Sequence, residues 1–242
     1  MLWTAAIIAG GPASRLGGRD KSGLPVGDHS ILDRQLEVLR PLTDRILIVA
    51  NQPGRFRATG LPVVGDVLTG AGALGGIYTA LDSAGTEYVL AVACDMPFLT
   101  ARFLEHLVNA ALDFDLVIPR SPDGLQPLCA VYSRRCLQAI RARIADGALR
   151  VQDLAADVRA REIGPEELAG FDPDGRLFFN VNTAADYARA REVAARTERP
   201  IDPHDDRITH AVGVRQSNGG RPPTGRASRG HPETRRRRSR RQ

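Results

Sequence analysis

Residues 5–21, AAIIAGGPASRLGGRDK, decide the fold class of this chain. The first five residues are apolar without interruption, as is typical of a strand buried on both faces of a parallel sheet. Four glycines and three cationic side chains follow within the next twelve residues. Glycine lets the backbone turn tightly and bring its N–H groups close to a ligand. A buried strand that ends in such a loop indicates an α/β protein with a ligand site at the carboxyl end of that strand.

Apolar runs and amphipathic stretches alternate from there to about residue 196. We expect strands at the nearly continuous apolar runs 5–9, 46–50, 89–93, 116–118, 128–132 and 177–181. We expect helices where apolar residues recur at helical spacing, at 31–39, from about 77, and at 103–112, 133–144 and 183–196. Ser30 and Thr100 stand where helix N-caps are needed. The alternation predicts an α/β fold with a single doubly wound, mostly parallel sheet.

The last segment of the chain differs in composition. Beyond about residue 196 apolar periodicity stops, Pro, Gly, Ser and Arg dominate, and the chain ends with an arginine run at 235–241. We therefore expect one folded domain, 1–196, followed by a disordered tail, 197–242. Residues 221–242 hold nine arginines against one glutamate, a net +8, so the overall charge of +5 leaves −3 for the other 220 residues. The folded part gives no electrostatic reason to bind nucleic acid, and only the tail keeps that function open.

Several other classes of protein are disfavoured. The apolar runs are too short to cross a bilayer, and the amino terminus lacks the charged start and cleavage site of a secretory signal. Cys94, Cys129 and Cys136 are odd in number and widely spaced, which indicates neither a disulfide framework nor a zinc site. We expect a cytoplasmic protein.

The first glycine-rich loop has the composition of a triphosphate cradle. It lacks the Gly-Lys-Ser/Thr of a P-loop and the spacing of a dinucleotide-binding loop. The backbone N–H groups of Gly10 and Gly11 are expected to face phosphate oxygens, with Arg15 and Lys21 supplying positive charge. Lys21 is the only lysine in the chain, beside 32 arginines. An ammonium differs from a guanidinium in reach and geometry, so we expect this position to need lysine.

The strand ends add further candidates. Ile8 and Ala9 close the first strand and Asn51 follows the second, so we place all three in the nucleotide site. Asp95, in the sequence Cys-Asp-Met-Pro at 94–97, follows the most strongly apolar strand and is our candidate Mg²⁺ ligand. The alternative role for Asp95 is to cap a helix beginning near Pro97.

Two weaker signals lie elsewhere. Asp66 follows the run 61–65 and precedes a second glycine-rich loop, 70–76, whose backbone is expected to lie against a base or ribose. Asn180 and Asn182 follow the last predicted strand. Asn182 would bind the metal or the acceptor, or would instead cap the final helix.

Together these motifs resemble one known family. Ala-Gly-Gly-x-x-x-Arg-x-Gly at 9–17, Asp20-Lys21, Gly-x-Leu-x-Gly at 72–76, Cys-Asp-Met-Pro at 94–97 and Asn-x-Asn-Thr at 180–183 are similar to the molybdenum cofactor guanylyltransferases. The resemblance covers about residues 4–195. It implies the glycosyltransferase-like nucleotidyltransferase fold, also called nucleotide-diphospho-sugar transferase-like, for the domain 1–196.

The resemblance also assigns roles. It implies that the first loop binds the phosphates and guanine of GTP, that Asp66 binds the nucleotide and that Asp95 binds Mg²⁺. Asn180 and Asn182 would lie on the side of the acceptor, molybdopterin. The implied product is a molybdopterin dinucleotide, formed with release of pyrophosphate, and the resemblance allows contact with molybdoenzyme maturation proteins as further partners.

Departures from the family pattern leave alternatives. Leu16 replaces the usual methionine, and Gln126-Pro127 replaces a common His-Pro pair, which leaves the acceptor open. Met96 favours GTP, since cytidylyl relatives more often have glutamine there. The alternatives are a nucleotidyltransferase that uses CTP or another phosphorylated acceptor, a regulatory protein that binds nucleotide without turnover, and a nucleic-acid-binding protein acting through the tail.

The expected mechanism needs no covalent intermediate. A phosphate oxygen of the acceptor attacks the α-phosphorus of the triphosphate, and pyrophosphate leaves. Catalysis then consists of positioning and of stabilising charge, which we assign to Arg15, Lys21 and Asp95. A phosphate monoester is largely ionised at neutral pH, so no general base is required.

The single lysine yields the first testable prediction. Lys21→Arg keeps the charge but changes the shape of the cationic head, and we expect turnover to fall at least about tenfold, or ~1.4 kcal/mol of transition-state stabilisation. Steady-state kinetics of both proteins measure this loss. Wild-type turnover in the variant would show that charge alone matters at this position.

Overall fold

The computed structural model describes residues 1–9 and 22–197. Gly10, Gly11, Arg15 and Lys21 lie outside the described residues, as does the tail from residue 198 onward. The domain boundary near residue 196 therefore stays a prediction. None of the helices within the described ranges has the length and apolar character needed to span a membrane.

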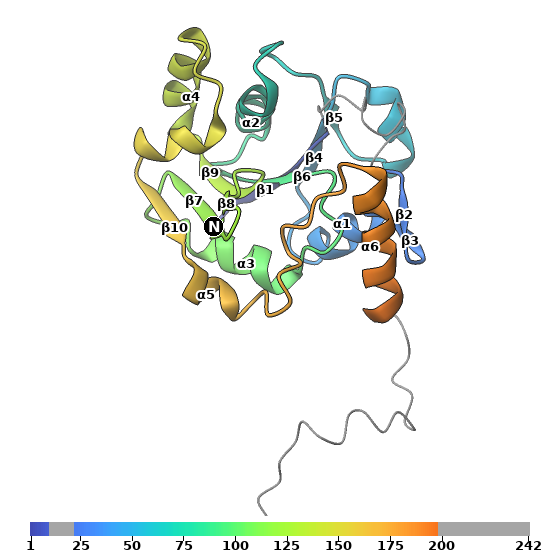
Figure 1. The fold of residues 1–242 in the computed structure, drawn as a ribbon. Helices are drawn as coiled ribbons and strands as arrows, with labels where there is room; N and C mark the ends of the chain where they lie inside the picture. The colour runs from blue at the N-terminus through green and yellow to red at the C-terminus, as the bar shows by residue number, and fades with distance from the viewer. Residues whose placement is uncertain (10–21, 198–242) are drawn as a thin grey trace, which may run out of the picture. The chain divides into compact units, whose positions relative to one another are not determined.

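One large sheet organises the described part of the chain (Figure 1). Its strands there are β1 (Trp3–Ile8), β4 (Ile46–Val49), β5 (Val63–Val64), β6 (Tyr88–Ala93), β7 (Leu116–Ser121), β8 (Gly124–Leu125), β9 (Cys129–Ser133) and β10 (Ala160–Ile163). The strand order is β10-β7-β9-β6-β1-β4-β5, with β8 paired to β7. The pairs β6–β1, β1–β4, β4–β5 and β10–β7 are parallel, whereas β9 runs antiparallel to both of its neighbours. The predicted α/β fold with a doubly wound, mostly parallel sheet is confirmed.

Helices cover both faces of the sheet. Side chains alternate between the two faces along each strand, and here both sets are apolar and need to be buried. Ala5 and Ile7 of β1 pack with helices α1 (Ile31–Leu39), α3 (Ala101–Asn109) and α5 (Pro165–Ala169). Ala6 and Ile8 pack on the opposite face with α2 (Gly72–Ser83) and α4 (Cys136–Ala145). Figure 1 shows these two layers on either side of the sheet. Strands that bury both faces explain the continuous apolar runs of the sequence.

Smaller elements complete the domain. A hairpin of β2 (Pro25–Val26) and β3 (His29–Ser30) packs with α6 (Ala184–Thr197) in an apolar cluster of Val26, Ala190 and Ala194, which Ile31 of α1 joins. Short 3₁₀ helices lie at η2 (Pro53–Thr59) and η3 (Val151–Ala156). The predicted N-caps are confirmed: Ser30 Oγ accepts from the Asp33 N–H at 3.1 Å, and Thr100 Oγ1 accepts from the Phe103 N–H at 3.4 Å.

Two predicted elements were wrong. Residues 177–181 form no strand; their apolar character reflects a buried loop, because Leu177 packs in the α1–α3 layer and Val181 packs with α6. Helix α2 begins at Gly72 and not near Ile77. Its glycines indicated a loop because glycine disfavours helices, but packing requires them at Gly75 and Gly76.

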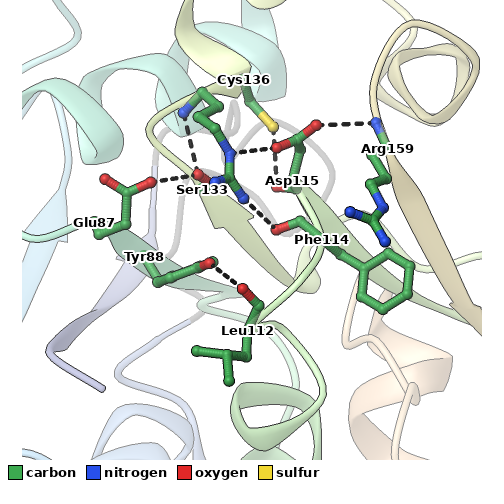
Figure 2. A network of polar contacts seen from close by, with 9 residues as sticks. Glu87, Tyr88, Leu112, Phe114, Asp115, Ser133, Cys136 and Arg159 are labelled. Atoms are coloured by element: carbon green, nitrogen blue, oxygen red, sulfur yellow. Dashed lines mark hydrogen bonds and ion pairs between the residues drawn. The ribbon is translucent and has the colours of Figure 1, made fainter.

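A network of polar contacts lies at the end of the sheet where β6 and β7 begin (Figure 2). The Asp115 carboxylate accepts from Arg135 Nε at 2.5 Å and from the Arg159 N–H at 3.0 Å. Ser133 at the end of β9 donates from Oγ to Glu87 Oε1 at 2.7 Å. These bonds join the starts of β6, β7 and β10 to the end of β9, and so fix the antiparallel strand between its parallel neighbours. The opposite edge, where the parallel strands end, is left for ligands.

Gly75 provides a stability test of this packing. A Cβ placed on Gly75 would lie 2.8 Å from the backbone oxygen of Leu68, which cannot move aside cheaply. Alanine favours a helix over glycine by about 1 kcal/mol, but overpacking typically costs about 1–3 kcal/mol. We therefore expect Gly75→Ala to lower the free energy of unfolding, as measured by urea denaturation.

The matched control is Gly54→Ala in η2. A Cβ there would meet nothing within 4 Å, so we expect the stability to be unchanged or slightly raised. If Gly75→Ala were as stable as this control, the close approach of α2 to residue 68 would not constrain the fold.

Candidate functional site

A cavity of about 560 Å³ lies at the carboxyl ends of the central parallel strands. This volume is within the usual range of small-molecule sites, roughly 300–1,000 Å³. Its described walls come from the end of β1, the start of α2, the segment after β6, the β7–β9 connection and the segment before α6. The residues that line the cavity include Ile8, Ala9, Arg55, Asp66, Gly76, Asp95, Met96, Gln126, Gln152, Asn180 and Asn182.

Most of the described residues predicted for the site meet at this cavity. Ile8 and Ala9 reach it from β1, Asp95 from the end of β6, and Asn180 and Asn182 from the segment before α6. Asp66 lies after β5, and Asn51 contacts the cavity through Asp66. The structure thus brings together side chains that are up to 174 positions apart in the sequence, from Ile8 to Asn182.

Asn51 and Asp66 form a two-bond pair. Asn51 Nδ2 donates to Asp66 Oδ2 at 2.9 Å, and Asn51 Oδ1 accepts from the Asp66 N–H at 2.9 Å. These bonds fix the carboxylate and leave its other oxygen, Oδ1, buried without a hydrogen-bond partner among the described residues. A buried carboxylate oxygen is costly without a donor, so Oδ1 is suited to accept a hydrogen bond from a ligand.

Gly76 shapes the same corner of the cavity. A Cβ on Gly76 would lie 2.9 Å from Ile8 Cγ2 and 3.9 Å from Asp66 Oδ1. Only glycine therefore allows α2 to approach the end of β1 this closely. The second glycine-rich segment acts here as a helix start that brings backbone against the site.

Asp95 lies half-buried directly after β6 and its backbone is held from two elements. The carbonyl of Asp95 accepts from the Val181 N–H at 3.0 Å, and the neighbouring Cys94 N–H donates to Ile8 O at 3.1 Å. The alternative capping role is wrong, because α3 begins at Ala101 and its cap is Thr100. Asp95 is thus a cavity-lining carboxylate and not a helix cap.

The described side chains do not form a metal site made of protein ligands alone, but they fit a Mg²⁺ ion that is bound partly by the substrate. Among residues 1–9 and 22–197 there is no group of three or more His, Cys, Asp or Glu side chains placed to hold a metal. Mg²⁺ in nucleotide sites usually takes one or two carboxylates, with waters and substrate phosphates as its other ligands. A single carboxylate at Asp95, facing a cavity large enough for a nucleotide, fits that pattern.

The two asparagines are positioned by the turn before α6. Asn180 Nδ2 donates to Phe178 O at 2.9 Å. The cap of α6 is Thr183, whose Oγ1 accepts from the Asp186 N–H at 3.1 Å. The capping role considered for Asn182 is therefore wrong, and its side chain lines the cavity instead.

Sequence reasoning missed other cavity residues. Arg55 on η2 is the cationic side chain on the described wall, and Gln152 reaches the cavity from η3. Neither residue lies at a strand end or in a motif, so the only signal in the sequence was that both side chains are polar. Gln126 was noted as a departure from the family pattern, and its Nε2 donates to Ser121 Oγ at 2.8 Å.

Two cysteines are excluded from nucleophilic chemistry. Burial raises the pKa of the Cys136 thiol to about 12, and burial also raises the pKa of Cys129 far above its usual range. Both thiols stay protonated at neutral pH, whereas a nucleophile or metal ligand must be a thiolate.

Comparison with known proteins agrees with this geometry. Residues 5–160 match the family described as the MobA-like NTP transferase domain. A molybdenum cofactor guanylyltransferase of Desulfosudis oleivorans is 34% identical over 188 residues, which cover 77% of this chain and 93% of that protein. A probable molybdenum cofactor guanylyltransferase of Pelotomaculum thermopropionicum is 35% identical over 79% of this chain and 93% of its own.

Solved structures show the same fold. The molybdopterin-guanine dinucleotide biosynthesis protein A of Archaeoglobus fulgidus superposes with a TM-score of 0.69 at 25% identity, covering 80% of this chain and 99% of that one. A Mycobacterium tuberculosis protein, solved in complex with manganese, shares the fold with a TM-score of 0.57 at 20% identity, covering 79% and 99%. With residues 5–160 matched and relatives above 30% identity covered almost completely, the chain belongs to the MobA-like NTP transferase domain family and is a nucleotidyltransferase.

Proposed function

We propose that this enzyme transfers GMP from GTP to the terminal phosphate of molybdopterin and releases pyrophosphate. The observation that carries the proposal is the meeting of Asp95, the Asn51–Asp66 pair and the two asparagines at one cavity. The names of the relatives, molybdenum cofactor guanylyltransferases, supply the nucleotide and the acceptor.

The nucleoside is assigned to the wall that contains Asp66. An ionised carboxylate can only accept hydrogen bonds, so Oδ1 calls for an N–H or O–H of the base or ribose. Asn51 holds Asp66 with two bonds of 2.9 Å, one to the carboxylate and one from the backbone N–H, so little freedom is lost when the nucleotide binds. Met96, which distinguishes this motif from the cytidylyl type, is buried and lines the same cavity.

The triphosphate is assigned to the first glycine-rich loop, with Gly10, Gly11, Arg15 and Lys21. That loop directly follows Ala9, which lines the cavity. Arg55 adds positive charge from η2. These cations would neutralise charge that accumulates on pyrophosphate as it departs.

Asp95 would hold Mg²⁺ in this arrangement. The ion would supply positive charge that offsets the negative charge developing on the phosphates during transfer. The acceptor is assigned to Asn180 and Asn182, which can donate hydrogen bonds from their amides to phosphate or pterin groups. In-line attack then needs only correct placement, because an ionised phosphate monoester is already a nucleophile.

Nucleotide and acceptor preference can be tested directly. Purified enzyme is incubated with Mg²⁺, molybdopterin and either GTP or CTP labelled at the α-phosphate, and labelled dinucleotide and pyrophosphate are measured. We expect kcat/KM for GTP to exceed that for CTP by at least about 100-fold, since a site built on hydrogen bonds rejects ligands that cannot complete them.

Equal use of both nucleotides, or a preference for CTP, would contradict the proposed substrate. Turnover of GTP only with another phosphorylated metabolite would retain the nucleotide and replace the acceptor. Contact with molybdoenzyme maturation proteins stays a prediction and calls for a separate binding measurement.

Asp95→Asn tests the metal role. Asparagine is nearly isosteric with aspartate, so we expect unchanged circular dichroism and thermal stability, but the charge that holds Mg²⁺ is lost. Turnover should fall by about two orders of magnitude or more. Rates are measured as a function of Mg²⁺ concentration in both proteins.

Asp82→Asn is the matched control, since it removes the same charge from an exposed position on α2. We expect this variant to keep wild-type turnover and its Mg²⁺ midpoint. An Asp95→Asn enzyme that behaved like the control would leave the proposed metal site without its ligand.

A further inference from the structure

Gln35 is a buried amide that reaches from α1 to the segment carrying Asp95. Gln35 is only 1% exposed to solvent. Its Nε2 donates to Ala93 O at 2.6 Å and to Met96 O at 3.0 Å. Both partners are carbonyl oxygens, which can only accept, so the orientation of the amide is fixed by chemistry. One side chain thereby joins the two carbonyls that flank Cys94 and Asp95.

The amide is an exception on an otherwise apolar face of α1. The neighbouring buried residues of α1, Leu32, Leu36 and Leu39, form an apolar face in the core layer below the sheet. Gln35 Oε1 is buried there and has no hydrogen-bond partner among the residues that the structure describes. A buried unsatisfied oxygen is unfavourable, and an apolar residue would avoid it. Local violations of this kind are characteristic of functional positions.

The bonds of Gln35 complete a set that surrounds Asp95. The carbonyl of Asp95 accepts from the Val181 N–H, and the Cys94 N–H donates to Ile8 O. Gln35, on α1, binds the carbonyls of Ala93 and Met96, which stand on either side of Cys94 and Asp95. The backbone at 93–96 is therefore tied to α1, β1 and the segment before α6 together, which restricts the direction of the Asp95 side chain.

We propose that Gln35 is a positioning residue for Asp95: its amide fixes the 93–96 backbone so that the carboxylate is oriented before metal and nucleotide bind. This role rests on the proposed function, in which Asp95 holds Mg²⁺. Groups that orient a metal ligand through one further contact typically change metal affinity or activity about 10–100-fold when removed.

Gln35→Met is the informative variant. Methionine has a similar length and no donor; it removes the unsatisfied oxygen but leaves the carbonyls of Ala93 and Met96 without their donor. We therefore expect the thermal stability to fall moderately, as it should in the control below. The Mg²⁺ midpoint of GTP turnover should rise about tenfold and kcat should fall, while KM for GTP at saturating metal stays near the wild-type value. Gln35→Asn, whose amide is one methylene shorter, should change the midpoint in the same direction.

Leu39→Val is the matched control. Leu39 is fully buried on the same helix and face, and the substitution disturbs packing without touching an amide. We expect this control to lower stability and to keep the Mg²⁺ midpoint. A shift of equal size in Leu39→Val would overturn the proposal, because general loosening of α1 would then explain the effect.

Two measurements without turnover keep the proposal separate from the proposed function. Binding of Mn²⁺ to the protein alone is followed by electron paramagnetic resonance, and hydrogen exchange is followed in peptides covering 94–97 and 180–182. Gln35→Met should bind Mn²⁺ more weakly and exchange faster in both peptides, whereas Leu39→Val should match the wild type. Wild-type exchange and Mn²⁺ binding in Gln35→Met would overturn the proposal. If the wild-type enzyme transferred no nucleotide, the proposed function would fail, and these two measurements would still decide the positioning role.

Discussion

The parallel pairing of β1 with β6 is the constraint on which the rest of the site depends. Six residue pairs run in register from Trp3 and Tyr88 to Ile8 and Ala93. Because both strands end at the same level, the end of β1 and the segment containing Asp95 lie side by side, with the Cys94 N–H bonded to Ile8 O. A slip of this register would separate the end of β1 from the proposed metal ligand, and would also turn buried side chains toward the wrong layer. The same hydrogen-bond ladder thus specifies both the core and the chemistry.

Much of this arrangement follows from the sequence, because a parallel sheet buried on both faces leaves a clear pattern. The apolar runs that became β1, β4 and β6 are continuous, and strands of this kind end at a shared ligand-binding edge. Asp66 and Asp95 could be placed at that edge from their positions directly after apolar runs. Ser30 and Thr100 could be identified as caps because their short side chains satisfy free N–H groups at helix starts.

Other features depend on contacts between distant segments and leave no local pattern. The run 177–181 is apolar because it is a buried loop, and a short apolar run does not reveal whether a neighbouring strand is available for pairing. The early start of α2 at Gly72 depends on the space beside Ile8 and the oxygen of Leu68. Gln35 interrupts an otherwise apolar helix face, and only the position of the carbonyls at 93 and 96 explains why. Arg55 and Gln152 reach the cavity from short 3₁₀ helices, whose sequences carry no strong periodicity.

The reversed direction of β9 places a connection between strands, and not a strand end, at one wall of the cavity. Its parallel neighbours present their ends to the cavity, but β9 presents its beginning, so the connection that includes Gln126 and Pro127 forms a wall next to Asp95. The network around Asp115 fixes the far end of β9, so this connection can change in length or composition without moving the ladder between β1 and β6. Such a change at this wall would leave the carboxyl ends of β1 and β6, and the Asn51–Asp66 pair beside them, in place.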